Sequence, residues 1–188
     1  MLTHYIEIRV RPDPEFSESM LLGALFSKLH RALADLQSNS IGVSFPQYSL
    51  KPKTLGNTLR IHADPAMLDK LSNTGWLRGM RDHVQINEMM HIPETAEYRT
   101  LSRKQFKTNV ERLRRRRMKR KGESYEEACA YIPDTVERRS DLPFICLRSQ
   151  SNGNTFLQFI ELGTPQAEPI PGQFNTYGLS TTATVPWF

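Results

Sequence analysis

The stretch Thr3-His-Tyr-Ile-Glu-Ile-Arg-Val10 alternates apolar and polar side chains, and residues 17–36 follow it with apolar side chains at helical spacing. Alternation with a period of two predicts a half-buried strand over residues 3–10, which Pro12-Asp-Pro14 ends. Ser17 is a favourable N-cap for a helix that runs to about Leu36. The stripe that this helix should bury consists of Leu22, Leu25, Phe26, Leu29, Leu33 and Leu36.

The next elements extend this strand and helix into a recognisable order. Residues 41–45 and 59–63 have the pattern of short strands, and residues 84–87 have that of a fourth. Asp64-Pro65 supplies a cap and a proline at the first helical position, so a helix to about Leu71 is expected. The order β-α-β-β-α-β is the ferredoxin-like pattern. We therefore predict an α+β fold whose ferredoxin-like domain spans residues 1–93.

The second half, residues 94–188, differs in composition. A polar, basic segment reaches about residue 105, and a helix over residues 124–131 is expected because Ser124 and Glu127 have the spacing of a capping box. Residues 142–150 and 155–162 form a predicted hairpin around Asn152-Gly153. Residues 163–173 should be a loop, and 174–180 and 182–188 two last strands. We predict a distorted ferredoxin-like half that carries an arginine-rich helix.

That helix lies in the densest cluster of positive charge in the chain. Residues 99–121 include twelve Lys or Arg and one acid, Glu111, although the whole chain has a net charge of only +5. Asn109 is a suitable cap, and Glu111 lies in the first turn, where the helix dipole favours an acid. Arg112, Arg115, Arg116 and Lys119 then share one face. A rigid row of cations matches a run of phosphates, which predicts a nucleic-acid partner.

Composition argues against several other classes of protein. The two cysteines, Cys129 and Cys146, form no CxxC motif, which argues against a zinc site or a disulfide framework and fits a reducing cytoplasm. No apolar run approaches the ~20 residues that span a bilayer, and the N-terminus lacks the apolar core of a signal peptide. An anionic membrane surface is a poor alternative partner, because the basic helix has little apolar surface to insert. We expect neither a bound metal nor a cofactor.

If the partner is RNA, the simplest cleavage chemistry uses the 2′-hydroxyl of the substrate as nucleophile and needs only a positioned proton acceptor. Histidine is the natural acceptor near neutral pH, and the chain has five: His4, His30, His62, His83 and His91. Composition does not choose among them. By the helical period, His30 lies at the edge of the apolar stripe, where it could border both core and cleft. The alternative is a partly buried histidine that only satisfies a hydrogen bond.

Short motifs then follow one another in a fixed order: Arg9-Val-Arg-Pro-Asp-Pro-Glu-Phe16, Lys28-Leu-His30, Arg60-Ile-His-Ala63, Ser102-Arg-Lys-Gln105, Glu111-Arg-Leu-Arg-Arg-Arg116, Leu147-Arg-Ser-Gln-Ser151, Tyr177-Gly-Leu-Ser180 and Val185-Pro-Trp-Phe188. In this order and over nearly the whole length, the chain resembles the subtype I-F CRISPR repeat endoribonucleases, the Csy-type branch of the Cas6 superfamily. The resemblance implies an enzyme that cuts precursor CRISPR RNA at the foot of a hairpin.

The resemblance also implies catalytic roles. His30 matches the general base, Ser149 the serine that holds the ribose before the cut, Tyr177 the tyrosine that orients the histidine, and Ser151 a serine near the scissile phosphate. From the residues alone, the two serines could equally serve the turn before Asn152-Gly153. Tyr177 could equally be a half-buried strand aromatic.

The implied RNA contacts are of two kinds. Arg103 and Gln105 match readers of base edges near the stem base, and Phe156 matches an aromatic that stacks under the last base pair. The residues matched to phosphate contacts are Arg115, Arg116, Lys119 and Arg120, together with Arg112 on the same face. From the residues alone, Arg103 could be one more phosphate contact and Phe156 a core residue. Arg117 and Lys119 depart from the leucine and arginine of the family.

Together these features predict a metal-independent endoribonuclease in the cytoplasm. It would cleave at the 3′ base of the repeat hairpin through 2′-hydroxyl attack, leave a 2′,3′-cyclic phosphate and stay bound to the guide RNA. Its partners would be the CRISPR RNA and the other Cas subunits of a type I-F surveillance complex. One alternative is a non-cleaving subunit of that complex that only binds the hairpin. The other is a DNA-binding regulator, against which stands the absence of an obvious helix-turn-helix.

Overall fold

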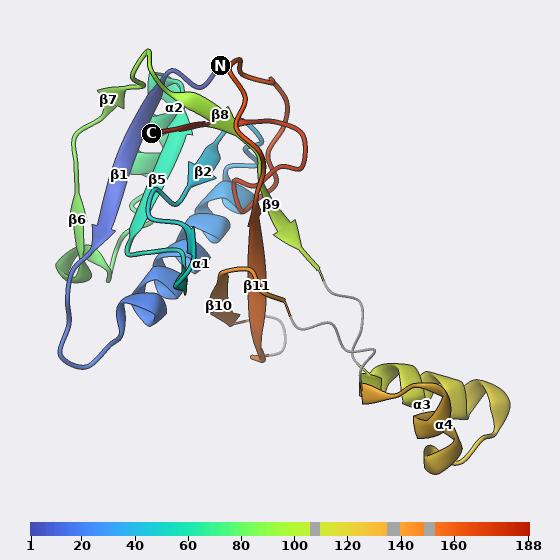
Figure 1. The fold of residues 1–188 in the computed structure, drawn as a ribbon. Helices are drawn as coiled ribbons and strands as arrows, with labels where there is room; N and C mark the ends of the chain where they lie inside the picture. Colours follow the sequence, from blue (N-terminus) through green and yellow to red (C-terminus); the bar gives the residue numbers. More distant parts are fainter. Residues whose placement is uncertain (106–109, 135–139, 149–152) are drawn as a thin grey trace. The chain divides into compact units, whose positions relative to one another are not determined.

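The computed structural model describes residues 1–105, 110–134, 140–148 and 153–188 (Figure 1). Its helices and antiparallel sheets confirm the predicted α+β class. The chain forms two compact units, one of residues 1–104 with 142–188 and one of residues 105–141. The predicted division at residue 93 falls inside the first unit. That division was drawn from the order of the predicted strands and helices and not from compactness, so it stays a prediction.

A five-stranded sheet organises the first unit. Strands β2 (Gly42–Ser44), β5 (Thr58–Ala63), β1 (His4–Val10) and β6 (Val84–Ile86) are hydrogen-bonded in that order, and β7 (Met90–His91) also pairs with β1. Every pair is antiparallel. The four strands predicted in this region are therefore confirmed.

Two helices complete the first part of the chain. Helix α1 (Glu18–Asp35) begins at its N-cap Ser17, and α2 (Pro65–Asn73) begins at its N-cap Asp64, as the sequence predicted. Helix α1 contacts β1, β5 and β10 (Phe144–Arg148). A side chain at Gly23 would come within 2.5 Å of the Cys146 carbonyl oxygen, so only glycine permits this approach of helix to strand. Helix α1 is thereby fixed between two sheets.

The second sheet of the first unit has the order β10-β11-β9, with β11 at Thr155–Leu162 and β9 at Leu101–Lys104. The hairpin strands were predicted, and β10 begins at Phe144, two residues later than expected. Strand β9 was missed, because Leu101 is its one apolar residue and no alternation marks it as a strand. Two smaller ribbons pair β12 (Val185–Trp187) with β8 (Glu97–Arg99) and β3 (Ser49–Leu50) with β4 (Lys53–Thr54).

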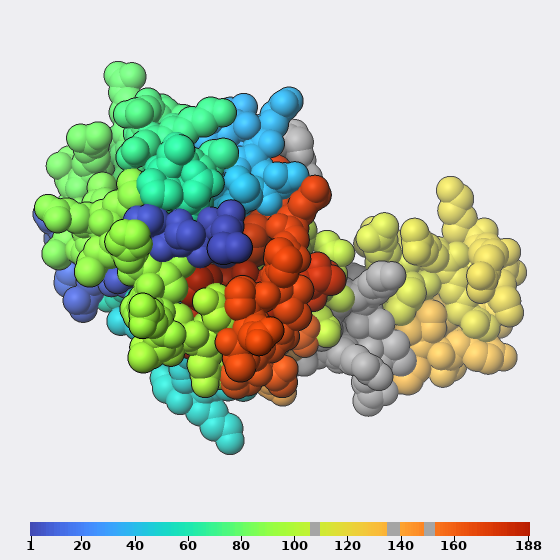
Figure 2. Space-filling model, turned by 90° about the horizontal axis from the view of Figure 1, so that it is seen from above, coloured from blue at the N-terminus to red at the C-terminus, as the bar shows by residue number. Residues whose placement is uncertain are grey.

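Residues from the two ends of the sequence lie side by side in the first unit. Phe188 packs edge-on against the ring of Tyr5 with centroids 5.0 Å apart, and the Arg60 guanidinium lies 3.9 Å from the Phe188 ring centroid. Figure 2 shows the N-terminal residues, in blue, beside the red C-terminal part of the chain. The strand β1 is therefore covered by residues that are remote in sequence.

The second unit consists, in its described part, of α3 (Val110–Lys121) and α4 (Tyr125–Tyr131), which pack together. Helix α4 has the predicted capping box, in which the Ser124 and Glu127 side chains each accept from the backbone of the other residue. The predicted cap Asn109 lies outside the described residues. Along the described ranges, no helix is long and apolar enough to cross a membrane.

Candidate active site

His30 of α1 and Tyr177 form the closest aromatic pair in the described structure. Their rings stack with centroids 3.8 Å apart and an interplanar angle of 3°. The Nδ1 atom of His30 lies 3.0 Å from the carbonyl oxygen of Thr176. A carbonyl only accepts, so Nδ1 must carry the hydrogen of this bond. In the neutral imidazole, Nε2 then keeps its lone pair and is the atom that can accept a proton.

The sequence places His30 at the border of the core. Its neighbour Leu29 is fully buried, whereas His30 itself is half-buried. The apolar stripe of α1 therefore anchors the helix and leaves the imidazole at the margin, as the helical period predicted. One ring nitrogen is bonded and one is available, which is the arrangement that a general base requires.

The loop that holds His30 is fixed by Asn175. The Asn175 Oδ1 atom accepts from the backbone N–H groups of Tyr177 at 2.8 Å and of Leu179 at 3.2 Å. The Asn175 backbone closes the same turn, because its N–H donates to Leu179 and its carbonyl accepts from Gly178. This network sets the positions of the Thr176 carbonyl and the Tyr177 ring together.

Gly178 ties this loop to the five-stranded sheet. It has a φ of +70°, and a Cβ atom there would come within 2.6 Å of a Val43 side-chain carbon. Its carbonyl accepts from the Val43 N–H at 3.0 Å. The strand predicted over residues 174–180 is therefore wrong: the Asn175 side chain and the positive φ of Gly178 turn the chain instead.

Tyr177 lies between His30 and the core and is also influenced by the charge of Arg103. Its ring also stacks on the fully buried Phe26, with centroids 5.6 Å apart. Burial raises the pKa of Tyr177, and the charge of Arg103 opposes this shift. The phenol therefore stays neutral near physiological pH, and Arg103 is close enough to act on it electrostatically.

The two predicted serines, Ser149 and Ser151, lie outside the described residues. The flanking residues are described: Arg148 ends β10, its partner Thr155 begins β11, and the Arg148 Nε donates to the Gly153 carbonyl at 3.2 Å. In the sequence, both serines fall between Arg148 and Gly153.

The predicted base readers lie on and beside the second sheet. Arg103 is exposed on β9 opposite Ile160, and its guanidinium carbon is 5.9 Å from the ring centroid of Phe156. Phe156 is half-buried on β11 and packs against the core with one part of its surface. Gln105 is exposed just beyond the end of β9. The structure thus brings Arg103 and Phe156 together.

The cations of α3 divide into an exposed set and an internal set. Exposed are all five predicted contact residues, Arg112, Arg115, Arg116, Lys119 and Arg120. In the described part of the chain, four of them, Arg115, Arg116, Lys119 and Arg120, have no carboxylate partner. We call these four the open cations.

The internal set is Arg114 and Arg117, which hold the second unit together. Arg114 is 6% exposed, donates twice to the Ile132 carbonyl and pairs with Asp134 at 2.8 Å and Glu111 at 3.1 Å. Arg117 pairs with Glu123 at 2.6 Å and lies 3.9 Å from the ring centroid of Tyr131. Sequence reasoning missed both structural roles, because the spacing of the cations along α3 does not show which of them pair with carboxylates outside the helix.

Two further features bear on what the first unit can bind. In the described ranges, no three His, Cys, Asp or Glu residues gather in a way that could hold a metal ion.

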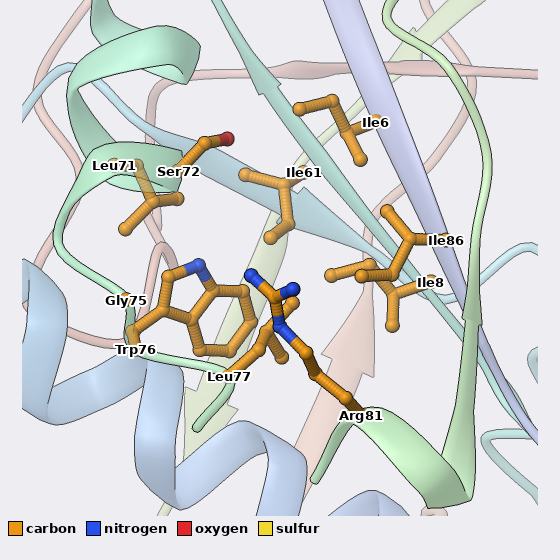
Figure 3. A pocket seen from close by; sticks show the side chains of 10 residues that line it. All are labelled: Ile6, Ile8, Ile61, Leu71, Ser72, Gly75, Trp76, Leu77, Arg81 and Ile86. Carbon is orange, nitrogen blue, oxygen red and sulfur yellow. The ribbon is translucent and has the colours of Figure 1, made fainter. Parts of the chain in front are cut away.

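A cavity of about 220 Å³ opens over the five-stranded sheet, where Trp76 and Arg81 face Ile6, Ile61 and Ile86 (Figure 3). Neither His30 nor Tyr177 lines this cavity.

Comparison with known proteins adds family information to this geometry. Residues 5–188 match the family model of the CRISPR-associated protein Cas_Csy4. The chain is 49% identical over 187 residues to the CRISPR-associated endonuclease Cas6/Csy4 of Pseudomonas aeruginosa (strain UCBPP-PA14), with all of both chains covered. It is 43% identical to the protein of the same name from Escherichia coli (strain UTI89 / UPEC), again with full coverage.

Proposed function

The chain belongs to the Cas_Csy4 family of CRISPR-associated proteins, and on this premise we propose that it is an endoribonuclease that processes precursor CRISPR RNA. It cleaves at the 3′ base of the repeat hairpin. The observation that carries this proposal is the pairing of His30 with Tyr177 and the Thr176 carbonyl, which leaves Nε2 as a proton acceptor.

The proposed reaction is an internal transfer of the phosphoryl group. His30 Nε2 takes the proton of the 2′-hydroxyl before the cut, and the resulting oxygen attacks the adjacent phosphorus. The bond from phosphorus to the 5′ oxygen breaks, that oxygen leaves with a proton taken from solvent, and a 2′,3′-cyclic phosphate remains. This route needs positioning and a base, and it proceeds without a metal ion.

The other proposed catalytic residues position the ribose and the base. Ser149 holds the ribose of the attacking hydroxyl, and Ser151 lies near the scissile phosphate. Tyr177 keeps the imidazole plane fixed by stacking at 3.8 Å, while the Thr176 carbonyl fixes its tautomer. Because the Tyr177 phenol remains neutral, it does not serve as a proton acceptor, and its proposed role is orientation of the imidazole.

The proposed RNA contacts separate selection from affinity. Arg103 and Gln105 read base edges at the foot of the stem, where the end of an A-form helix is accessible. Phe156 stacks under the last base pair, and the nearby Arg103 guanidinium limits where that pair can lie. The exposed cations of α3, Arg112 included, contact phosphates. They therefore contribute binding affinity that decreases as the salt concentration rises.

The same phosphate contacts also support slow release of the product. The cleaved hairpin keeps all of its phosphate contacts, so the enzyme stays bound to the mature guide RNA and makes few turnovers. In this state it joins the other Cas subunits of a type I-F surveillance complex in the cytoplasm.

The proposed architecture is a ferredoxin-like domain over residues 1–93 followed by a distorted ferredoxin-like RNA-binding half over residues 94–188. The antiparallel order β2-β5-β1-β6, with α1 and α2 as the two connecting helices, supports the first assignment. For the second half, the support is the three-stranded sheet β10-β11-β9.

A cleavage assay on the repeat hairpin in EDTA tests the proposal. The control substrate has one 2′-deoxy nucleotide before the cut site. We expect cleavage of the first substrate and tight binding without cleavage of the second. Cleavage of both would refute 2′-hydroxyl attack. Tight binding with cleavage of neither would instead identify a non-cleaving, hairpin-binding subunit.

Competition with duplex DNA at moderate salt tests the nature of the nucleic acid. We expect the hairpin RNA to compete better by orders of magnitude, because Arg103, Gln105 and Phe156 are matched to a stem end. Equal competition by duplex DNA would favour a DNA-binding regulator.

A further inference from the structure

His4 and His91 face each other across two paired strands on the surface of the first unit. They are register partners in the antiparallel pair β1–β7, so their side chains leave the same face of the sheet. Their Nε2 atoms are 3.2 Å apart, and their ring centroids are 3.9 Å apart. The proposed RNA chemistry uses neither residue.

We propose that His4 and His91 form a two-histidine site for a borderline divalent transition-metal ion such as Zn²⁺ or Ni²⁺. Imidazole nitrogen is the ligand type that these ions prefer. Two nitrogens bound at about 2.0–2.1 Å to one ion are about 2.9 Å apart at a right angle and about 3.4 Å apart in a tetrahedron. The observed separation of 3.2 Å between the Nε2 atoms lies between these values.

The surroundings of His4 support Nε2 as its ligand atom. Its Nδ1 atom lies 3.0 Å from the Thr3 hydroxyl, which can accept the Nδ1 hydrogen. A hydrogen bond to the second ring nitrogen is the usual outer-shell support of a metal-bound histidine, because it fixes the tautomer. With the hydrogen on Nδ1, Nε2 of His4 carries the lone pair and lies 3.2 Å from the Nε2 atom of His91.

The surroundings of His91 leave it free to adapt. Its side chain is exposed, so the ring can turn about its side-chain bonds and aim Nε2 at a shared ion. In the metal-free pair, one Nε2 must donate to the other. On binding, that hydrogen moves to Nδ1 through solvent, two lone pairs coordinate the ion, and the ion releases two of its waters. Water completes the coordination, since the described residues supply no third ligand.

Such a site stabilises the folded chain, because the two histidines meet only when β7 pairs with β1. An ion that binds the folded state and not the unfolded chain raises the melting temperature with its concentration. A hard ion such as Mg²⁺ prefers oxygen ligands and should have no such effect.

The test is Zn²⁺ and Ni²⁺ titration of the full chain without a histidine tag, by calorimetry and by thermal melting. We expect a saturable rise in melting temperature with either ion and none with Mg²⁺. His4→Asn and His91→Asn should each weaken Zn²⁺ binding about tenfold or more, since each removes one of two protein ligands.

His83→Asn is the matched control, because His83 is paired with the Asp13 carboxylate at 3.0 Å rather than with a histidine. It should leave Zn²⁺ affinity unchanged. Equal affinities in the parent, His4→Asn and His91→Asn proteins would overturn the proposal, as would an equal loss in His83→Asn.

Discussion

The surroundings of His30 and the exposed face of α3 differ in how tightly their side chains are held. His30 is fixed by a stacked ring at 3.8 Å and a carbonyl at 3.0 Å, and the loop that supplies both is bonded to itself and to β2. The open cations of α3 have no carboxylate partner among the described residues. Proton transfer requires one geometry, whereas phosphate binding tolerates many. Single substitutions should therefore have large effects in the first region and small ones in the second.

His30→Ala should have the largest effect. General bases contribute about 10²- to 10⁴-fold to rate, so single-turnover cleavage should fall by roughly that factor. Hairpin affinity should stay nearly unchanged, because the base acts in the transition state. Cleavage kinetics and filter binding measured on the same preparation check both. A parallel loss of binding would make His30 structural.

Asn175→Ala should come next, because it removes the acceptor that holds the Thr176 carbonyl and the Tyr177 ring in place. Misplacement of a catalytic group by about 1 Å costs up to about 10²-fold, so we expect a loss of roughly ten- to a hundredfold in single-turnover rate. Hairpin affinity should not change. Asn175→Asp, which retains an acceptor oxygen, should recover most of the rate. Equal losses in both variants would show that this side-chain oxygen does not position the base.

Arg115→Ala should have a smaller effect that depends on salt. Removing one phosphate contact should lower the slope of log affinity against log salt by about one, without changing the preference among stems. Lys70→Ala is the matched control: Lys70 is an exposed cation on α2 of the first unit, outside the proposed RNA contacts, so the slope should remain that of the parent. If the slope were unchanged in Arg115→Ala, Arg115 would not be a phosphate contact.

The smallest effect concerns stability rather than RNA. Burial, and secondarily the charge of Arg60, lowers the pKa of His62 from 6.5 to about 3. Between these values the unfolded chain binds a proton that the folded chain does not, so stability should fall as the pH falls. His62→Gln can keep a hydrogen bond to Ser44 and should flatten this dependence. Denaturant unfolding at several pH values checks it, and an unchanged dependence would assign acid sensitivity to other groups.

Local patterns predicted the first part of the fold well. The alternation of residues 3–10, the cap at Ser17 and the Asp64-Pro65 start are each determined within a few residues, and the structure has them all. The position of His30 at the margin of α1 follows from the same period. These features depend on local spacing, which a sequence displays directly.

Features that depend on distant partners were not predictable in this way. Tyr177 and Asn175 lie in a segment whose apolar residues suggested a strand, and their turn is stabilised by contact with Val43. Likewise, Arg114 and Arg117 resemble their neighbours in sequence, and contacts with residues outside α3, among them Asp134 and Glu123, make them internal. The roles proposed for His30 and Tyr177 came from family resemblance, since neither residue type specifies a role by itself.

The chain leaves the first unit after β9 and returns to it before β10, and both strands flank β11 in one sheet. The arginine-rich segment is therefore an insert whose two attachment points belong to a single sheet, and the strands that border it also carry Arg103 and lead to Ser149. The proposed roles divide along the same boundary: substitutions within the insert should alter hairpin affinity, while the turn at Asn175 continues to hold the same imidazole.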